Sequence, residues 1–97
     1  MRIISVAPLR ECWNIHREAE GPLRSWYEMV DRAQWQTSSD VLATFNKADI
    51  IPDNRVVFNI FWNRYRIVVK IHYNTGLVFV RFVGTHAEYN RIDAETV

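Results

Sequence analysis

Positive charge without acidic neighbours marks one stretch of the sequence. The chain has 12 Lys and Arg against 11 Asp and Glu, and this net charge of +1 gives the whole protein little attraction for nucleic acid. Residues 54–87 nevertheless contain no Asp or Glu. That stretch carries Arg55, Arg64, Arg66, Lys70 and Arg81. Because the planar fork of arginine matches phosphate, the stretch could bind a polyanion.

A histidine and a tyrosine follow the last apolar run of the chain. Gly84 ends that run and is expected to let the chain turn sharply out of a sheet. His86 and Tyr89 come next, three residues apart, so one helical turn would place them side by side. Imidazole can move protons at neutral pH, and a phenol can donate or accept a hydrogen bond. A histidine that simply ends a strand remains the structural alternative.

Cys12 and His16 are the one pair with spacing for a shared metal ion. They lie four residues apart, but no third ligand is near in sequence, and Leu9 and Trp13 share their helical face. The pattern therefore favours ordinary helix packing, and we expect no metal and no cofactor. Cys12 is the only cysteine, which excludes an internal disulfide and agrees with a reducing compartment.

A two-faced sheet would have to position the cations. In residues 64–73 one face carries Tyr65, Ile67, Val69, Ile71 and Tyr73, and the other carries Arg64, Arg66, Val68, Lys70 and His72. Neighbouring strands extend the apolar face with Val56, Phe58, Ile60, Val78, Val80 and Phe82. They extend the other face, here called the cationic face, with Arg55, Asn59, Phe79 and Arg81. Any half-exposed sheet has a polar side, so alternation alone does not establish a binding surface.

Helices are predicted in the first half of the chain and strands in the second. Apolar residues recur with helical spacing in residues 9–16 and 23–30, and Gly21-Pro22 is expected to end the first helix and begin the next. Ser38 or Ser39 could cap a third, short helix. Strands are predicted at Arg55–Ile60, Arg64–Tyr73 and Leu77–Val83, with a hairpin turn at Asn74-Thr75-Gly76; residues 2–6 and 49–51 could add short strands.

These elements predict one α+β domain over residues 1–97, with N-terminal helices packed on one face of an antiparallel sheet of three to four strands. The four large aromatics of the first half are most simply core residues: Trp13, Trp26, Tyr27 and Trp35. No apolar run is long enough for a membrane helix, and the N-terminus does not resemble a signal peptide. We therefore expect a cytoplasmic protein that does not associate with membranes.

Three segments, Arg55–Ile60, Asn63–Ile67 and Val80–Tyr89, closely resemble the HigB toxin family of the RelE superfamily. Leu9–Trp13 and Pro22–Tyr27 are similar to it too, so the resemblance covers nearly the whole chain. It implies a RelE-like fold, cleavage of mRNA, usually on the ribosome, and a hetero-oligomer with a HigA-like helix-turn-helix antitoxin.

The resemblance also implies an active site lined by Tyr65-Arg66, Gly84, His86 and Tyr89. The sequence departs from the family at Phe61 and Trp62, where family members often have glycines before the Asn63–Ile67 segment.

The candidate catalytic residues follow from the chemistry of RNA, whose 2′-hydroxyl is its own nucleophile. Cleavage needs charge stabilisation at the phosphate and two proton transfers, without a cofactor. The residues assigned to these tasks are Arg66, Arg81 and Lys70 for charge, His86 for proton transfer and Tyr89 as a second donor. The candidate RNA-binding residues are Arg55, Asn63, Arg64, His72 and Phe79. A non-catalytic RNA-binding module and a protein-interaction domain that use the same face remain alternatives.

Overall fold

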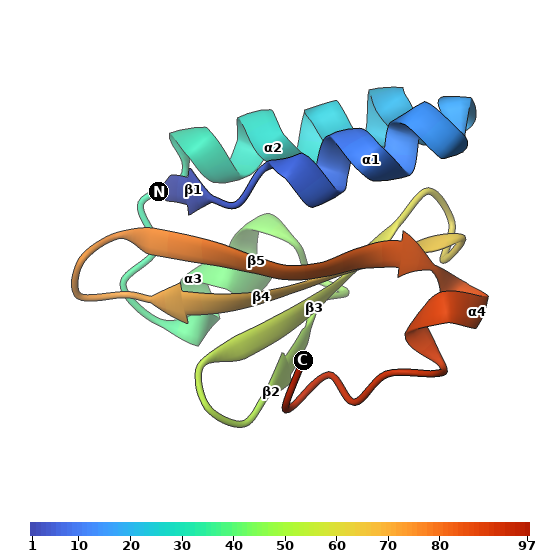
Figure 1. Cartoon of the computed structure of the whole chain (residues 1–97). Coiled ribbons are helices and arrows are strands. Elements are labelled where there is room, and N and C mark those ends of the chain that lie inside the picture. The colour runs from blue at the N-terminus through green and yellow to red at the C-terminus, as the bar shows by residue number, and fades with distance from the viewer.

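Five strands form the sheet in the computed structural model, which describes residues 1–97 (Figure 1). Their bounds are β1 Arg2–Ile4, β2 Asp49–Ile51, β3 Arg55–Ile60, β4 Tyr65–His72 and β5 Leu77–Thr85. The order across the sheet is β1-β5-β4-β3-β2, with β1 parallel to β5 and every other pair antiparallel. The expected α+β class is confirmed. The strand number is five instead of three to four, because both short segments pair at the edges of the sheet.

Helices cover one face of this sheet (Figure 1). They are α1 Ala7–Ile15, the 3-10 helix η1 Arg17–Ala19, α2 Glu20–Arg32 and α3 Ser38–Thr44, while the short α4 His86–Tyr89 follows β5. Gly21-Pro22 does not end the first helix, because α1 stops at Ile15 and η1 follows; the two residues do lie in the first turn of α2, as predicted, where proline needs no N–H partner. Thr37, and not Ser38 or Ser39, caps α3, through a capping box with Asp40. No helix is both long and apolar enough to cross a membrane.

Phe58 on β3 lies at the centre of the aromatic core between helices and sheet. Its ring centroid is 5.4 Å from that of Trp26, 6.3 Å from that of Trp35 and 5.0 Å from that of Phe45. Trp26 and Trp35 are buried, as expected. Trp13 and Tyr27 are only partly buried and pack at the margin of the core. Each aromatic contact contributes about 0.5–1.5 kcal/mol beyond the area it buries, so this cluster fixes the helices on the sheet.

A β-bulge in β5 changes which face its last residues occupy. Val68 pairs with Phe82 and Val69 pairs with Val80, which leaves Arg81 as the extra residue. Phe82 therefore lies on the same face as Val68, and the following residue, Val83, packs against the core instead. The prediction that Phe82 joins the apolar face is wrong, because the bulge shifts the alternation of β5 by one residue.

Two hairpin turns flank β4. The turn at Asn74-Thr75-Gly76 is confirmed between His72 and Leu77, with Gly76 at φ 71°. The β3–β4 turn is less usual, since three consecutive non-glycine residues have positive φ: Phe61 at 52°, Trp62 at 61° and Asn63 at 79°. A left-handed backbone costs an L-residue about 1–2 kcal/mol. Arg64 belongs to this turn, so β4 begins at Tyr65, one residue later than predicted.

The cationic face is partly covered by the chain itself. Val57 and Val68 are buried but lie outside the main core, because they face away from the helices. Residues 90–97, here called the C-terminal segment, return from α4 along the side of the sheet opposite α1 and α2 (Figure 1). The C-terminal segment therefore covers part of the face on which the sequence placed the cations.

Candidate active site

Arg66 is the best-positioned cation on the face away from α1 and α2. Its Nη1 atom donates hydrogen bonds to the carbonyl oxygens of Asn63, at 2.7 Å, and of Tyr65, at 3.3 Å. Its guanidinium carbon lies 5.6 Å from the centroid of the Tyr89 ring, a cation–π distance. The turn and α4 thus hold the guanidinium from two sides. Its remaining N–H donors have no partner in the chain, so they can bind a phosphate.

His86 begins α4, the short helix whose Tyr89 ring contacts Arg66. Thr85 caps the helix through a capping box with Glu88, and the backbone N–H of His86 donates to the carbonyl oxygen of Arg64 at 2.9 Å. The exposed His86 ring lies with Nδ1 3.1 Å from the side-chain nitrogen of Asn90. An amide nitrogen can only donate, so Nδ1 accepts and the neutral ring carries its proton on Nε2. Nε2 is therefore left to exchange a proton with a substrate.

Gly84 makes room for an aromatic side chain. A Cβ atom at this position would lie 2.7 Å from Cζ of Phe82 and 3.0 Å from a carboxylate oxygen of Glu88. Gly84 lies within β5 and not at a turn, so the predicted departure from the sheet at this residue is wrong; the chain leaves at Thr85. The Phe82 ring is 6.4 Å from the Tyr89 ring, so it packs behind the partner of Arg66. Strand alternation gave no signal for Phe82, because the bulge inverts its position.

The β3–β4 turn belongs to the same site. Asn63 and Arg64 are exposed, and the guanidinium carbon of Arg64 lies 5.1 Å from the Phe61 ring. The carbonyl oxygens of these two residues bind Arg66 and the His86 N–H respectively. The structure therefore brings together five of the predicted site residues, with Phe82 and Gly84 beneath them. We call this group the strand-end cluster; the five are Asn63, Arg64, Arg66, His86 and Tyr89.

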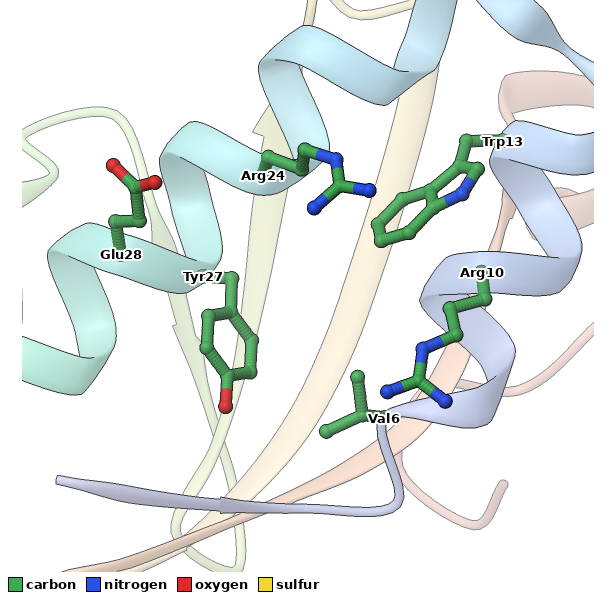
Figure 2. A pocket seen from close by; sticks show the side chains of 6 residues that line it. All are labelled: Val6, Arg10, Trp13, Arg24, Tyr27 and Glu28. Carbon is green, nitrogen blue, oxygen red and sulfur yellow. The ribbon is translucent and has the colours of Figure 1, made fainter.

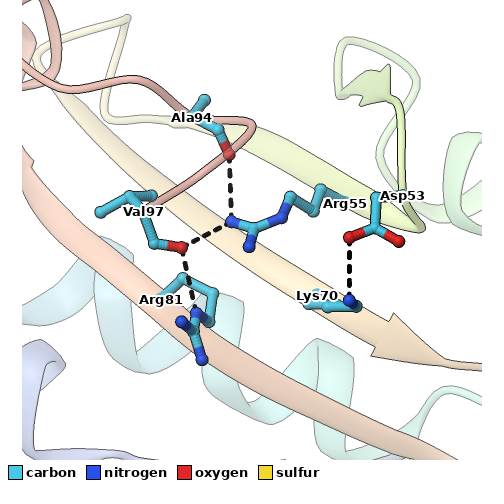
Figure 3. Close-up of polar contacts among 6 residues, drawn as sticks. All are labelled: Asp53, Arg55, Lys70, Arg81, Ala94 and Val97. Atoms are coloured by element: carbon cyan, nitrogen blue, oxygen red, sulfur yellow. Dashed lines mark hydrogen bonds and ion pairs between the residues drawn. The ribbon is translucent and has the colours of Figure 1, made fainter.

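Arg55 and Arg81 contact the C-terminal segment instead (Figure 3). Nη1 of Arg55 donates to the carbonyl oxygens of Ala94, at 3.2 Å, and Val97, at 2.6 Å, while Nε of Arg81 donates to the same Val97 oxygen at 3.1 Å. Arg55 is only 6% exposed, so its expected position on an open surface is wrong. Arg81 stays exposed on the bulge of β5.

Lys70, His72 and Phe79 lie toward the other end of the sheet. Nζ of Lys70 pairs with Oδ2 of Asp53 at 2.9 Å (Figure 3), and this contact lowers the pKa of the Asp53 carboxyl. The rings of His72 and Phe79 are 4.9 Å apart. Lys70 and Arg66 are four positions apart, about 13 Å along β4. The structure does not bring these three residues into the strand-end cluster.

Tyr65 contacts the helical layer, not the cluster. It is buried, and its hydroxyl donates a hydrogen bond to the Glu18 carboxylate on η1. Burial first, and then this bond, raise the pKa of Tyr65 to about 12, while the same bond lowers the pKa of Glu18. Of the pair Tyr65-Arg66, only Arg66 therefore faces the cluster.

The side chains provide neither a reactive thiol nor a group of ligands for a metal ion. Burial raises the pKa of the Cys12 thiol to about 11, so it stays protonated at neutral pH. No group of three or more His, Cys, Asp or Glu side chains is arranged to hold a metal ion.

A cavity of about 470 Å³ lies outside the strand-end cluster (Figure 2). It opens between α1 and α2, with the strands behind it, and shares no residue with the cluster. Its lining residues are Val6, Arg10, Trp13, Arg24, Tyr27 and Glu28. Volume alone would favour this cavity as the functional site, but it contains no histidine, and its Arg24 is paired with Glu20. The strand-end cluster contains an exposed histidine and an arginine with free N–H donors, so we place the candidate site there.

Comparison with known proteins agrees with the family suggested by the sequence. Residues 19–92, which include the whole strand-end cluster, match the HigB toxin family, described as the RelE-like toxic component of a toxin-antitoxin system. The mRNA interferase HigB of Escherichia coli O6:H1 is 26% identical over 94 residues, which are 95% of this chain and 91% of that relative. A toxin of this kind has an antitoxin as its partner. The chain belongs to the HigB family of RelE-like toxins, the toxic components of toxin-antitoxin systems.

Proposed function

We propose that this toxin is an endoribonuclease that cleaves mRNA at the strand-end cluster. The relative from Escherichia coli is named an mRNA interferase, which supports the same substrate here. The observation that carries the proposal is the place of Arg66, held between the Asn63 carbonyl oxygen and the Tyr89 ring next to the start of α4. A fixed guanidinium with free donors, in contact with the short helix that begins at an exposed histidine, is suited to phosphodiester cleavage.

The reaction uses the 2′-hydroxyl of the RNA as nucleophile. O2′ forms a bond to phosphorus and the bond from phosphorus to O5′ breaks, which leaves a 2′,3′-cyclic phosphate and a free 5′-hydroxyl. One proton leaves O2′ and one is delivered to O5′. Arg66 stabilises the charge that grows on the phosphate oxygens, and Nε2 of His86 carries one of the two protons. Tyr89 holds Arg66 in place and offers its hydroxyl as a second donor.

The remaining predicted residues take outer positions along the RNA. Arg81 is a second phosphate contact once its bond to the Val97 carbonyl oxygen is released. Lys70, His72 and Phe79 contact RNA farther from the scissile bond, where cations bind the backbone and rings stack on bases. Arg55 reaches RNA only if the C-terminal segment moves aside.

The setting of the reaction is part of the proposal. We propose that the mRNA is cut on the ribosome in the cytoplasm, without a metal ion. The antitoxin is a HigA-like helix-turn-helix protein that forms a hetero-oligomer with this chain. The support is the resemblance of Arg55–Ile60, Asn63–Ile67 and Val80–Tyr89 to the family.

The test separates cleavage from binding. Induction of the toxin without antitoxin should arrest bacterial growth and fragment mRNA, whereas His86→Ala should do neither. In single-turnover assays on saturated ribosomes, His86→Ala should lower the rate about 10²–10⁴-fold and leave ribosome affinity unchanged. His72→Ala is the matched control, because this exposed histidine lies on the same sheet but outside the cluster. It should leave the chemical step unchanged.

Two results would contradict the proposal. If His86→Ala cleaves at the wild-type rate, the proton-transfer group lies elsewhere. If neither protein fragments mRNA although both bind RNA, the chain is a non-catalytic RNA-binding module.

A further inference from the structure

Trp62, at the tip of the β3–β4 turn, is the most exposed large hydrophobic residue of the chain. Its exposed fraction is 89%, against 76% for Ile15 and about 40% for Met29 and Ile50. The other tryptophans are buried or partly buried. An indole that stays in water adds no hydrophobic stabilisation to the folded state, so this side chain does not contribute to the core.

The backbone that presents this indole is itself unfavourable. Phe61, Trp62 and Asn63 all have left-handed φ angles, which bulky L-residues rarely adopt. Such strain persists where surrounding contacts determine the conformation. Here the N–H of Arg64 donates to the carbonyl oxygen of Phe61 at 3.1 Å, and Arg66 donates to that of Asn63 at 2.7 Å. The turn is therefore fixed with its tryptophan pointing into solvent.

Two residues of the fixed turn, Asn63 and Arg64, belong to the strand-end cluster. Asn63, the neighbour of Trp62, accepts a hydrogen bond from Arg66, and the next residue, Arg64, accepts one from the N–H of His86. A phosphate bound by Arg66 would thus lie near Asn63, the residue that follows Trp62 in the chain. No Asp or Glu occurs in residues 54–87, so the hairpin that carries the exposed ring contributes cations and no carboxylate; the carboxylate of Glu18 comes from the helical layer and accepts a hydrogen bond from Tyr65. An exposed ring combined with cations suits single-stranded nucleic acid, whose bases stack on aromatic rings while cations follow the backbone.

We propose that Trp62 stacks on an RNA base next to the scissile phosphate and thereby adds to the affinity of the site for RNA, without taking part in the chemical step. This inference rests on the proposed RNA cleavage. The partner is a nucleobase of any type, because every base has a flat face to stack. A protein surface is the less favoured partner, because the chain neighbours of Trp62 do not extend it into an apolar patch: Asn63 is polar and exposed, and Phe61 is partly buried and packs on the core.

The experiment compares Trp62→Gly and Trp62→Phe with the wild type. Two measurements are made: single-turnover cleavage on ribosomes, and binding of a single-stranded RNA with 2′-O-methyl groups that block cleavage. Trp62→Gly should weaken RNA binding about 5- to 150-fold, the loss expected for one base stack, with kcat at saturation near that of the wild type. Trp62→Phe should restore part of the affinity. Met29→Ala, on α2, is the control and should change neither measurement.

A second arm tests stacking directly, with abasic nucleotides placed in turn at each position of the blocked RNA. At one position the wild type and Trp62→Gly should bind with equal affinity, because the stacked base is missing. Trp62→Gly should also raise the midpoint of thermal unfolding, because glycine adopts left-handed φ without strain. A residue needed for the fold would lower that midpoint instead.

The outcomes distinguish this inference from the proposed function. If the wild type cleaves RNA and Trp62→Gly binds and cleaves equally well, the stacking inference is wrong and the proposed function stands. If the wild type cleaves nothing, the proposed function fails, and binding of the blocked RNA still decides the role of Trp62. If Trp62→Gly keeps its RNA affinity but loses antitoxin binding, the indole is a protein contact and the inference is overturned.

Discussion

Arg66 is the residue on which the proposed chemistry depends most. Arg66→Ala should lower single-turnover cleavage about 10²–10³-fold, because its donors stabilise charge that develops in the transition state. Arg66→Lys should restore the rate only partly, since an ammonium group lacks the planar fork that Asn63, Tyr65 and a phosphate can share. The measurement is cleavage on saturated ribosomes. Arg24→Ala, an exposed arginine on α2, should cleave normally. Wild-type cleavage by Arg66→Ala would place the phosphate elsewhere.

The hydrogen bond between Tyr65 and Glu18 predicts a dependence of stability on pH. The bond lowers the pKa of Glu18, so the stability that it contributes is present above the unfolded value, about 4.3, and is lost as pH falls through the lower folded value. Burial first, and then the bond to Glu18, raise the pKa of Tyr65 to about 12, so the stability that the neutral phenol contributes is complete below the unfolded value, about 10, and is lost as pH rises through about 12.

Tyr65→Phe should therefore be less stable than the wild type near neutral pH, and the two should converge in acid and in strong base. Denaturant unfolding across pH measures the difference. Tyr89→Phe removes a hydroxyl that bonds nothing in this chain, and its difference from the wild type should not follow this profile. A Tyr65→Phe difference that is constant with pH would show that the ionised Glu18 contributes nothing.

β5 depends on a glycine that leaves space for a ring. Gly84→Ala should displace Phe82, whose ring would lie too close to the new methyl group, and should destabilise the protein by about 1–3 kcal/mol. Cleavage should fall as well, because Phe82 packs on Tyr89 and Tyr89 on Arg66. Gly21→Ala is the matched control, since a Cβ there meets nothing within 4 Å. The unfolding free energy and the cleavage rate are measured for both variants. Equal values for Gly84→Ala and Gly21→Ala would contradict this account.

The C-terminal segment supplies two carbonyl acceptors to one Nη atom of a buried arginine, Arg55, whose Nε has no partner. Deletion of residues 94–97 removes both carbonyl acceptors of Arg55 and should cost about 1.5–3 kcal/mol of unfolding free energy, because hydrogen bonds to a charged group are lost. Arg55→Met in the shortened chain should recover much of that loss, since both partners of the bond are then absent. Denaturant unfolding is measured for the wild type, Arg55→Met, the shortened chain and the shortened chain with Arg55→Met, which together form a double-mutant cycle. Equal losses with and without Arg55→Met would show that the segment acts through other contacts.

The molecule as a whole has two different sides. α1 and α2 cover one side with the core beneath them, and the other side carries the strand-end cluster and the C-terminal segment (Figure 1). On neither side are three metal-ligating side chains gathered. We therefore predict that cleavage survives a zinc-specific chelator when magnesium is kept for the ribosome. Activity that is lost on chelation and returns with added zinc would contradict this prediction.

Local sequence patterns determined much of this architecture. Helical spacing in residues 9–16 and 23–30, strand alternation in β4 and the turn at Asn74-Thr75-Gly76 predicted the α+β class and the hairpin on which Arg66 lies. These features depend on residues close in sequence, where backbone preference and periodicity act. The same locality explains why Gly84, His86 and Tyr89 could be recognised together as one segment.

Tertiary structure decided which of the candidate residues meet. The bulge at Arg81 moved Phe82 to the site, the C-terminal segment covered Arg55, and Asp53 bound Lys70. Each of these depends on a partner strand or on a distant residue; Arg55 and Val97, for example, are separated by 42 positions. Periodicity within one strand carries no information about pairing register or about what returns to cover a face. The sequence alone therefore predicted the elements and the residue types, and only packing between distant segments selected the cluster.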